Sequence, residues 1–252
     1  MKEFAGEKAI RINEISFRYD PHSLKKTLDN ITFEIPEGKV TAIVGASGSG
    51  KTTLIKLMLG YYPVSEGAIM VSGKNINEYN LKWWRRCCGV VMQDGVIFSE
   101  SIARNIAVGD SEVDIARLEQ AARIACIHDY ILSLPLKYNT KIGRDGVGLS
   151  QGQKQRILIA RAVYKNPVFI FLDEATNSLD AKNEREIVEN LDDFYKGRTV
   201  VVVAHRLSTV KNADQIVVID SGKVVEKGTH TELIEKQGGY FNLVKNQLEL
   251  GN

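Results

Sequence analysis

The sequence has few cysteines and no long hydrophobic run. Three cysteines occur in 252 residues, and two of them, Cys87 and Cys88, are adjacent. So few thiols make neither a disulfide framework nor a metal site with nearby histidines, as is usual in a reducing compartment. The longest apolar runs, such as 168–172 and 200–204, fall far short of the roughly 20 residues that a membrane-spanning helix needs. We therefore expect a soluble polypeptide in a reduced cytosolic compartment.

Strongly basic stretches are missing as well. No run of Lys and Arg is longer than two residues, and the formal net charge is only +2, so nothing predicts a nucleic-acid partner. Residues 1–14 carry charges where a secretory signal requires an apolar segment, and we expect no such signal. With 44% hydrophobic residues, a chain of this length can form one large α/β domain or two modest ones.

The sequence does contain a phosphate-binding loop, GASGSGKT, at residues 45–52. It fits the pattern G-x-x-x-x-G-K-[ST] at every fixed position, after an apolar run typical of a buried strand and before a segment with the composition of a helix. Glycines let successive N–H groups turn toward phosphate oxygens, and the helix start favours the negative charge. We expect Lys51 to reach the β- and γ-phosphates and the Thr52 hydroxyl to ligate Mg²⁺. The predicted nucleotide-binding residues of this stretch are Gly45, Ala46, Ser47, Gly48, Ser49, Gly50, Lys51, Thr52 and Thr53.

Periodicity divides the rest of the chain into strand-rich and helix-rich parts. Alternation of apolar and polar residues predicts antiparallel β structure near the N-terminus, at residues 10–19 and 31–35, with a short strand at 68–71. From about residue 100 to 166 the pattern is helical, with segments at 101–106, 113–125 and from Ser150 onward. Strand and helix then alternate, which predicts a mainly parallel sheet, over residues 168–172, 181–195, 199–203 and 215–219.

The apolar run at 168–172 ends in two carboxylates, Asp173 and Glu174. A buried strand delivers its terminal side chains to the carboxyl edge of the sheet, where ligands bind. Asp173 would hold Mg²⁺, directly or through water, and Glu174 would take a proton from an attacking water. The alternative for such an acidic pair is the N-cap of a helix.

Six segments follow one another along the chain: GASGSGKT, Gln93 after a strand, LSQGQ at 149–153, FLDEAT at 171–176, Ser178-Leu179-Asp180, and His205 in VVVAHRLS. In their order and spacing they resemble the nucleotide-binding domain of ATP-binding cassette (ABC) transporters over nearly the whole chain. The resemblance implies an α/β P-loop NTPase (RecA-like) core with a mainly parallel sheet, an antiparallel β subdomain and an inserted helical subdomain. It implies one domain over residues 1–252, with the core at 1–92 and 167–252 and the helical subdomain at 93–166.

The resemblance also assigns roles to single residues. Tyr19 should stack on adenine, the alternative being an edge-strand aromatic that packs locally. Gln93 should contact Mg²⁺ or the attacking water and link the site to the helical lobe, and His205 should hydrogen-bond the γ-phosphate. The implied catalytic residues are Lys51, Gln93, Glu174 and His205, and the implied Mg²⁺ ligands are Thr52, Gln93 and Asp173.

LSQGQ should begin a helix that serves the nucleotide of a second subunit. Ser150 and the Gly152 N–H would face the γ-phosphate, so that two chains pair head to tail as a homodimer around ATP. The implied signature residues acting in trans are Leu149, Ser150, Gln151, Gly152 and Gln153, and those communicating across the dimer are Ser178, Leu179 and Asp180. Two positions depart from the family: Gln151 replaces the usual Gly, and Arg144 stands where exporters commonly place Glu.

The stretch from His205 to Leu233 looks like the exporter branch, and QDGVIFSESIARNI with LSQGQKQR looks closest to bacterial peptide and bacteriocin exporters, including those with their own peptidase domain. The resemblance implies an ATP-hydrolysing motor at the cytoplasmic face of a bacterial membrane, attached to a transmembrane domain in the same or a separate chain. Other readings are export of lipid or drug-like cargo, a soluble cassette ATPase, and a regulatory cassette without turnover. Trp83 and Trp84, beside Arg85 and Arg86, form either core with solvated charge or part of the surface that receives the membrane domain.

Overall fold

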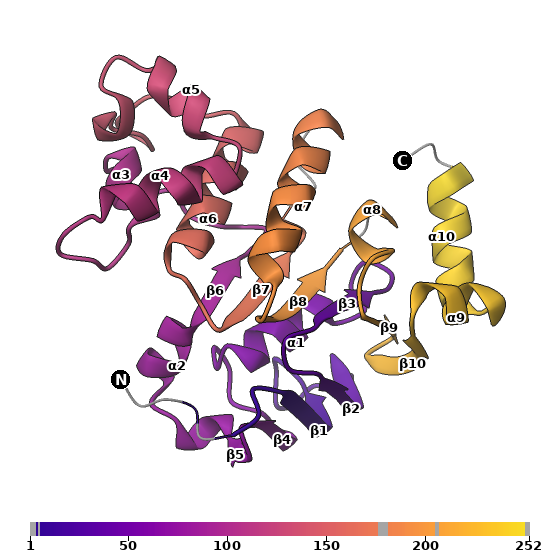
Figure 1. The fold of residues 1–252 in the computed structure, drawn as a ribbon. Helices are drawn as coiled ribbons and strands as arrows, with labels where there is room; N and C mark the ends of the chain where they lie inside the picture. The colour runs from indigo at the N-terminus through magenta and orange to yellow at the C-terminus, as the bar shows by residue number, and fades with distance from the viewer. Residues whose placement is uncertain (1–3, 5, 176–180, 205–206, 250–252) are drawn as a thin grey trace. The chain divides into compact units, whose positions relative to one another are not determined.

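A computed structural model describes residues 4, 6–175, 181–204 and 207–249. The chain divides into two compact units, one of residues 1–88 with 197–252 and one of residues 89–196 (Figure 1). The predicted subdomain borders at residues 93 and 166 stay a prediction.

The first unit begins with an antiparallel sheet in the order β2-β1-β4-β5, as the alternating pattern predicts. Its strands are β1 Ile10–Phe17, β2 Leu28–Ile35, β4 Glu66–Val71 and β5 Lys74–Asn75. Ile10 lies opposite Ile35 on one side and Val71 on the other, and all three side chains are fully buried. The alternation breaks between Ile12 and Ile15, where the register shifts and Glu14 takes a positive φ of 51°. Such an irregularity is a β-bulge, which bends the strand.

The second sheet of this unit explains the continuous apolar runs. Strand β3 (Val40–Val44) pairs in parallel with β8 (Thr199–Val203) and with β9 (Gln215–Asp220), and β10 (Lys223–Gly228) is antiparallel to β9. All five residues of β8 and four of the five of β3 are buried. Parallel strands covered on both faces are expected to have continuous apolar sequences, because neither face meets water.

Hydrogen bonds join two short helices of the first unit. Helix α1 (Lys51–Met58) begins directly after the glycine-rich loop, and α2 (Leu81–Cys87) follows the 3₁₀ turn η1 (Ile76–Glu78). Trp84 is fully buried and donates from its indole N–H to the Met58 carbonyl at 2.9 Å, while Arg85 donates to the Gly60 carbonyl at 3.3 Å. These bonds satisfy carbonyls that the C-terminus of α1 leaves free. Trp84 is therefore a core residue, whereas Arg86, two residues further along the chain, is exposed.

The first unit ends in two helices, α9 His230–Glu235 and α10 Gly239–Glu249, while α8 Leu207–Val210 lies earlier in the chain, between β8 and β9. Thr229 caps α9 in a capping box with Glu232. The Glu226 carboxylate on β10 accepts hydrogen bonds from the Gly239 and Tyr240 N–H groups at the start of α10. A carboxylate at a helix N-terminus satisfies free N–H groups and complements the helix dipole, so these bonds hold α10 to the sheet.

The second unit contains two adjacent strands, β6 Cys88–Val91 and β7 Phe169–Asp173, with a helical lobe between them in the chain (Figure 1). Its elements are α3 Ile102–Ile106, α4 Ile115–Ile124, α5 His128–Ser133, the 3₁₀ turn η2 Lys137–Asn139, α6 Gln151–Tyr164 and, after β7, α7 Ala181–Tyr195. Helices α3 and α4 pack against α6, which is the longest helix of the lobe and buries eight of its residues. In the described part of the chain, no helix combines the length and the apolar character needed to cross a membrane.

Candidate functional site

The phosphate-binding loop lies between β3 and α1, as its sequence context predicts. Gly45 and Gly50 take positive φ values of 149° and 107°. A Cβ atom at Gly45 would collide with the Ile219 carbonyl, and one at Gly50 would come within 2.5 Å of the Leu28 side chain, so both conformation and space require glycine. The crest of the loop, Ala46, Ser47 and Gly48, is exposed.

Lys51 is the first residue of α1 and is only 5% exposed. Its ammonium group donates to the Gly45 carbonyl at 2.9 Å and the Ala46 carbonyl at 2.8 Å, which holds a positive charge inside the loop. Gly50, the N-cap of α1, offers no side chain to the helix start, and the first turn holds no acidic residue. The free N–H groups and the dipole of α1 therefore remain available to an anion.

Ser49 adds a polar group to this loop. The residue is 4% exposed, and its hydroxyl has no hydrogen-bond partner within the described residues. Its backbone is tied to the turn between β9 and β10, because the Gly222 N–H donates to the Ser49 carbonyl at 3.1 Å. A buried hydroxyl is costly unless a partner reaches it, and a phosphate oxygen at the loop would be such a partner.

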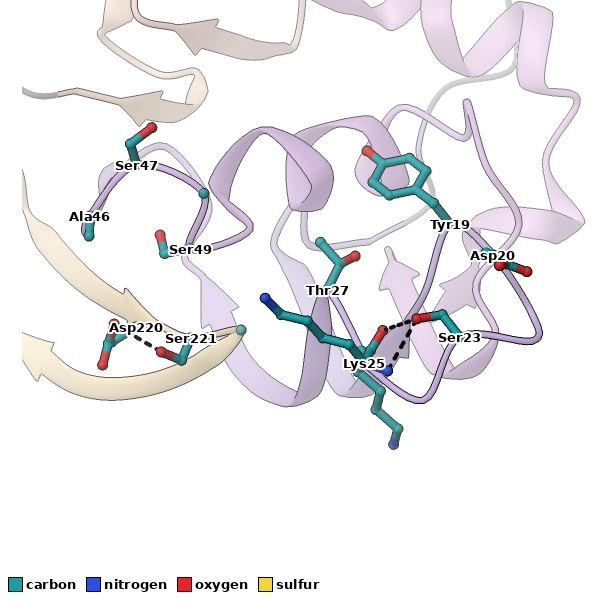
Figure 2. A pocket seen from close by; sticks show the side chains of 13 residues that line it. Tyr19, Asp20, Ser23, Lys25, Thr27, Ala46, Ser47, Ser49, Asp220 and Ser221 are labelled. Atoms are coloured by element: carbon teal, nitrogen blue, oxygen red, sulfur yellow. Dashed lines mark hydrogen bonds between the residues drawn. The ribbon is translucent and has the colours of Figure 1, made fainter.

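A cavity of about 590 Å³ opens beside the loop (Figure 2). In this view Tyr19 stands on one side and Ala46, Ser47 and Ser49 on the other. The residues that line the cavity are Tyr19, Asp20, Ser23, Lys25, Lys26, Thr27, Ala46, Ser47, Gly48, Ser49, Asp220, Ser221 and Gly222. The loop between β1 and β2 and the turn at 220–222 thus complete a site of which sequence reasoning found only Tyr19 and the phosphate loop. The dipeptide Ser221-Gly222 signals a turn, but nothing local indicates that this turn faces the cavity.

Tyr19 combines local packing with exposure at the cavity. Its ring meets Phe17 and Tyr62 edge-on, with centroids 5.0 and 5.2 Å apart, and its hydroxyl lies 3.1 Å from the Thr53 hydroxyl. Half of the side chain stays exposed. The edge-on contacts fix the plane of the ring, so the structure contains the local packing and also leaves ring surface open beside the phosphate loop.

The second unit contains the predicted acidic pair and Gln93. Asp173 ends β7 and is 1% exposed, and Glu174 follows with a positive φ of 53° and a half-buried side chain. Gln93 is exposed two residues after β6, the strand next to β7. A strained backbone at a non-glycine residue directs attention to Glu174, since such conformations concentrate at functional sites.

The LSQGQ segment starts α6, as the sequence predicts. Ser150 is the N-cap: its hydroxyl accepts the Gln153 N–H at 3.2 Å, and the Gln153 side chain accepts the Ser150 N–H at 2.8 Å. Ser150 and Gln151 are exposed, and Leu149, Gly152 and Gln153 are half-buried. Arg144 is exposed and lines a groove of about 330 Å³ together with Gly95, Ile97, Gly143, Val147, Gly148, Leu149 and Lys154.

The remaining predicted residues, His205, Ser178, Leu179 and Asp180, lie outside the described residues. Among the residues that the structure describes, no group of three or more His, Cys, Asp or Glu side chains could hold a metal ion. That finding does not bear on the predicted Mg²⁺ ligands, a hydroxyl, an amide and one carboxylate, because Mg²⁺ sites in nucleotide enzymes use one or two carboxylates with water and substrate phosphates.

Residues 28–177 match a protein family described as ABC transporter, and the chain belongs to that family. The leukotoxin translocation ATP-binding proteins LktB of Mannheimia haemolytica and Bibersteinia trehalosi are each 44% identical to the chain over 250 residues. A bacterial Atm1-family ABC exporter with ATP bound superimposes with a TM-score of 0.92 and 36% identity over 96% of the chain. The chain spans only 35% of the length of these LktB proteins and 42% of the Atm1-family exporter chain.

These likenesses confirm three predictions made from the sequence: the α/β fold class, the ABC nucleotide-binding domain and its assignment as an ATPase. The predicted roles of single residues stay predictions.

Proposed function

We propose that the chain is the ATP-hydrolysing motor domain of an ABC exporter and that it acts with Mg²⁺ as a head-to-tail homodimer. The observation that carries this proposal is the phosphate loop: an uncapped helix N-terminus, a lysine held within the loop and a 590 Å³ cavity beside it. In this proposal the cavity accepts the base and ribose, with adenine on the exposed part of Tyr19. The loop N–H groups and Lys51 hold the phosphates.

Hydrolysis requires a positioned water and neutralised phosphate charge. Mg²⁺, held by Thr52, Gln93 and Asp173 together with phosphate oxygens, would neutralise charge on the leaving group. We assign the acceptance of the water proton to Glu174 and the hydrogen bond to the γ-phosphate to His205. In the dimer, Ser150 and the Gly152 N–H of the partner would close the site, with Gln151 beside the interface and Ser178, Leu179 and Asp180 relaying between sites.

The exporter role and its partner rest on the relatives. The LktB proteins are named for leukotoxin translocation, and the structural relative is an exporter. We therefore propose export of a peptide-like cargo through a transmembrane domain in the same or a separate chain. The domain would then work at the cytoplasmic face of a bacterial membrane. Export of lipid or drug-like cargo is the second candidate, because likeness to an exporter fold does not by itself select a class of cargo.

Substitution of Glu174 by Gln tests the proposal. Glu174→Gln should keep ATP binding and slow hydrolysis about 10²- to 10⁴-fold, the usual cost of a lost general base. The variant should accumulate as an ATP-bound dimer, which size-exclusion chromatography with light scattering detects. A wild-type chain that neither binds nor hydrolyses ATP with Mg²⁺ would overturn the proposed function, and normal hydrolysis by the variant would assign the base to another group.

A further inference from the structure

Arg161, on the third turn of α6, is a half-buried cation whose contacts within the described residues are all with neutral groups. Its guanidinium donates to the Asn105 carbonyl at 2.7 Å, the Val96 carbonyl at 2.9 Å and the Asn105 side-chain oxygen at 3.2 Å, and it lies 5.2 Å from the centre of the Phe98 ring. None of the ion pairs between described residues includes Arg161. Burial lowers the pKa of Arg161 to about 10.

Asn105, at 0% exposure, continues this network into the segment that follows Gln93. Its side-chain oxygen accepts the Phe98 N–H at 2.8 Å. Its side-chain amide donates to the carbonyls of Phe98, Glu100 and Ser101 at 2.9, 3.3 and 3.1 Å. Every polar atom of this buried amide therefore binds either backbone between Phe98 and Ser101 or Arg161.

The same segment packs directly on α6. A Cβ atom at Gly95 would collide with the Leu158 side chain, so the backbone passes close to the helix one turn before Arg161. Gln93 is two residues from Gly95, and Ser150 begins the helix on which Leu158 and Arg161 lie. Residues 93–98 and helix α6 thus lie in one compact unit. They are joined by the contact of the Gly95 backbone with the Leu158 side chain and by the hydrogen bond from Arg161 to the Val96 carbonyl.

We propose that Arg161 and Asn105 are positioning residues of ATP hydrolysis: they clamp the 95–98 segment to α6, so that Gln93 and the LSQGQ segment hold one geometry. This inference rests on the proposed function. The chemistry explains the choice of arginine, because its planar fork of donors can reach two carbonyls and a side-chain oxygen at once. A half-buried charge without a carboxylate partner costs stability, and an apolar residue would fill the buried part of the same space at lower cost. We explain the presence of Arg161 by the position that it gives the 95–98 segment on α6.

A double-mutant cycle on kcat for ATP hydrolysis tests the clamp. Arg161→Ala should lower kcat about 10- to 100-fold, the range that misplacement of a catalytic group causes, and leave KM for ATP nearly unchanged, because Tyr19 and the phosphate loop lie in the other unit. Arg161→Lys keeps the charge but not the fork, so it should share the defect. In a Gln93→Ala background, Arg161→Ala should cause little further loss of kcat, since the side chain of Gln93 that Arg161 positions is already absent.

Tyr164→Phe is the matched control. Tyr164 lies one turn further along α6, and the partners of its hydroxyl among the described residues are the Asp110 carboxylate and the Asp114 N–H, each at 3.1 Å, neither of which belongs to the 95–98 segment. This variant should keep kcat. Hydrogen exchange gives a readout separate from activity: Arg161→Ala should accelerate exchange of the Phe98 N–H, and Tyr164→Phe should not.

Failure of the clamp proposal can be distinguished from failure of the proposed function. Suppose that the wild type hydrolyses ATP but the kcat losses of Gln93→Ala and Arg161→Ala multiply in the double variant, or that Arg161→Lys has the full wild-type kcat. In either case the clamp is wrong and the proposed function stands. If Arg161→Ala does not fold, Arg161→Lys carries the same comparison with Gln93→Ala.

Discussion

At the scale of single residues, Tyr19 shows how one side chain serves two purposes. Its edge contacts with Phe17 and Tyr62 and its hydroxyl bond to Thr53 hold the ring, while half of the side chain stays exposed at the cavity. Local packing and nucleotide stacking are therefore compatible, and only a comparison of variants separates their contributions.

Tyr19→Ala should weaken ATP binding by about 1 kcal/mol or a little more, the usual value of aromatic stacking, whereas Tyr19→Phe and Tyr19→Trp should bind nearly as well as the wild type. Titration calorimetry with ATP and Mg²⁺ measures the three affinities. Equal losses in all three variants would mean that Tyr19 acts through its packing and its hydroxyl.

Cys126 yields a prediction about pH. Burial, with a smaller contribution from the Glu186 carboxylate, raises the pKa of the Cys126 thiol to about 11. The thiolate is the reactive form, so at pH 8 the folded protein should alkylate at Cys126 about 100-fold more slowly than the same cysteine in denaturant, and the rate should rise as the pH approaches 11. Peptide mapping after timed exposure to iodoacetamide gives the rate at this one thiol. A rate equal to that of the unfolded chain would contradict the assigned burial.

At the scale of elements, the sequence predicts what its local patterns encode. The phosphate loop was predictable because residue spacing, the preceding strand and the following helix all agree, and the structure has β3 and α1 on either side of it. The break in β1 at Glu14 was not, since a bulge depends on the partner strands.

Other elements were missed for different reasons. Helix α9 has a visible signal, the Thr229 and Glu232 capping box, which could have located it. The contacts of Arg161 have no such signal, because its partners, the carbonyls of Val96 and Asn105, lie 65 and 56 residues away in the chain. The turn at 220–222 lines the nucleotide cavity for the same kind of long-range reason.

Two capping boxes allow a matched test of the LSQGQ segment. Ser150 caps α6 and Thr229 caps α9 with the same pair of hydrogen bonds. Ser150→Ala and Thr229→Ala should each cost about 1 kcal/mol of stability in urea unfolding. Only Ser150→Ala should also lower ATPase activity, because the Ser150 hydroxyl accepts the Gln153 N–H and can still donate to a phosphate of the partner's nucleotide. Equal ATPase activity in both variants would reduce Ser150 to a helix cap.

At the scale of the whole molecule, the central claim is that each nucleotide is held between the phosphate loop of one chain and LSQGQ of its partner. Two lesions on opposite sides of such a site should each abolish activity. Lys51→Ala removes the cation that the loop holds against the Gly45 and Ala46 carbonyls, and Ser150→Arg obstructs the γ-phosphate.

The mixture of these two variants is the decisive sample. In a mixed dimer one composite site carries both lesions, and the other combines an intact phosphate loop from the Ser150→Arg chain with an intact signature from the Lys51→Ala chain. About half of the dimers formed from equal amounts are mixed, and each has one complete site. Activity should therefore return toward about a quarter of the wild-type rate, or less if the two sites must cooperate.

The measurement is the ATPase rate of Lys51→Ala and Ser150→Arg, purified separately and then mixed at concentrations that favour dimers, with pull-down of one tagged chain to verify mixed pairs. A covalently linked dimer of one wild-type half and one Lys51→Ala half contains a single complete composite site, and its ATPase rate shows whether one such site can turn over. We predict recovered hydrolysis in the mixture and almost none in either variant alone. Mixed dimers that stay inactive, while the linked dimer with one wild-type half hydrolyses ATP, would contradict the composite site.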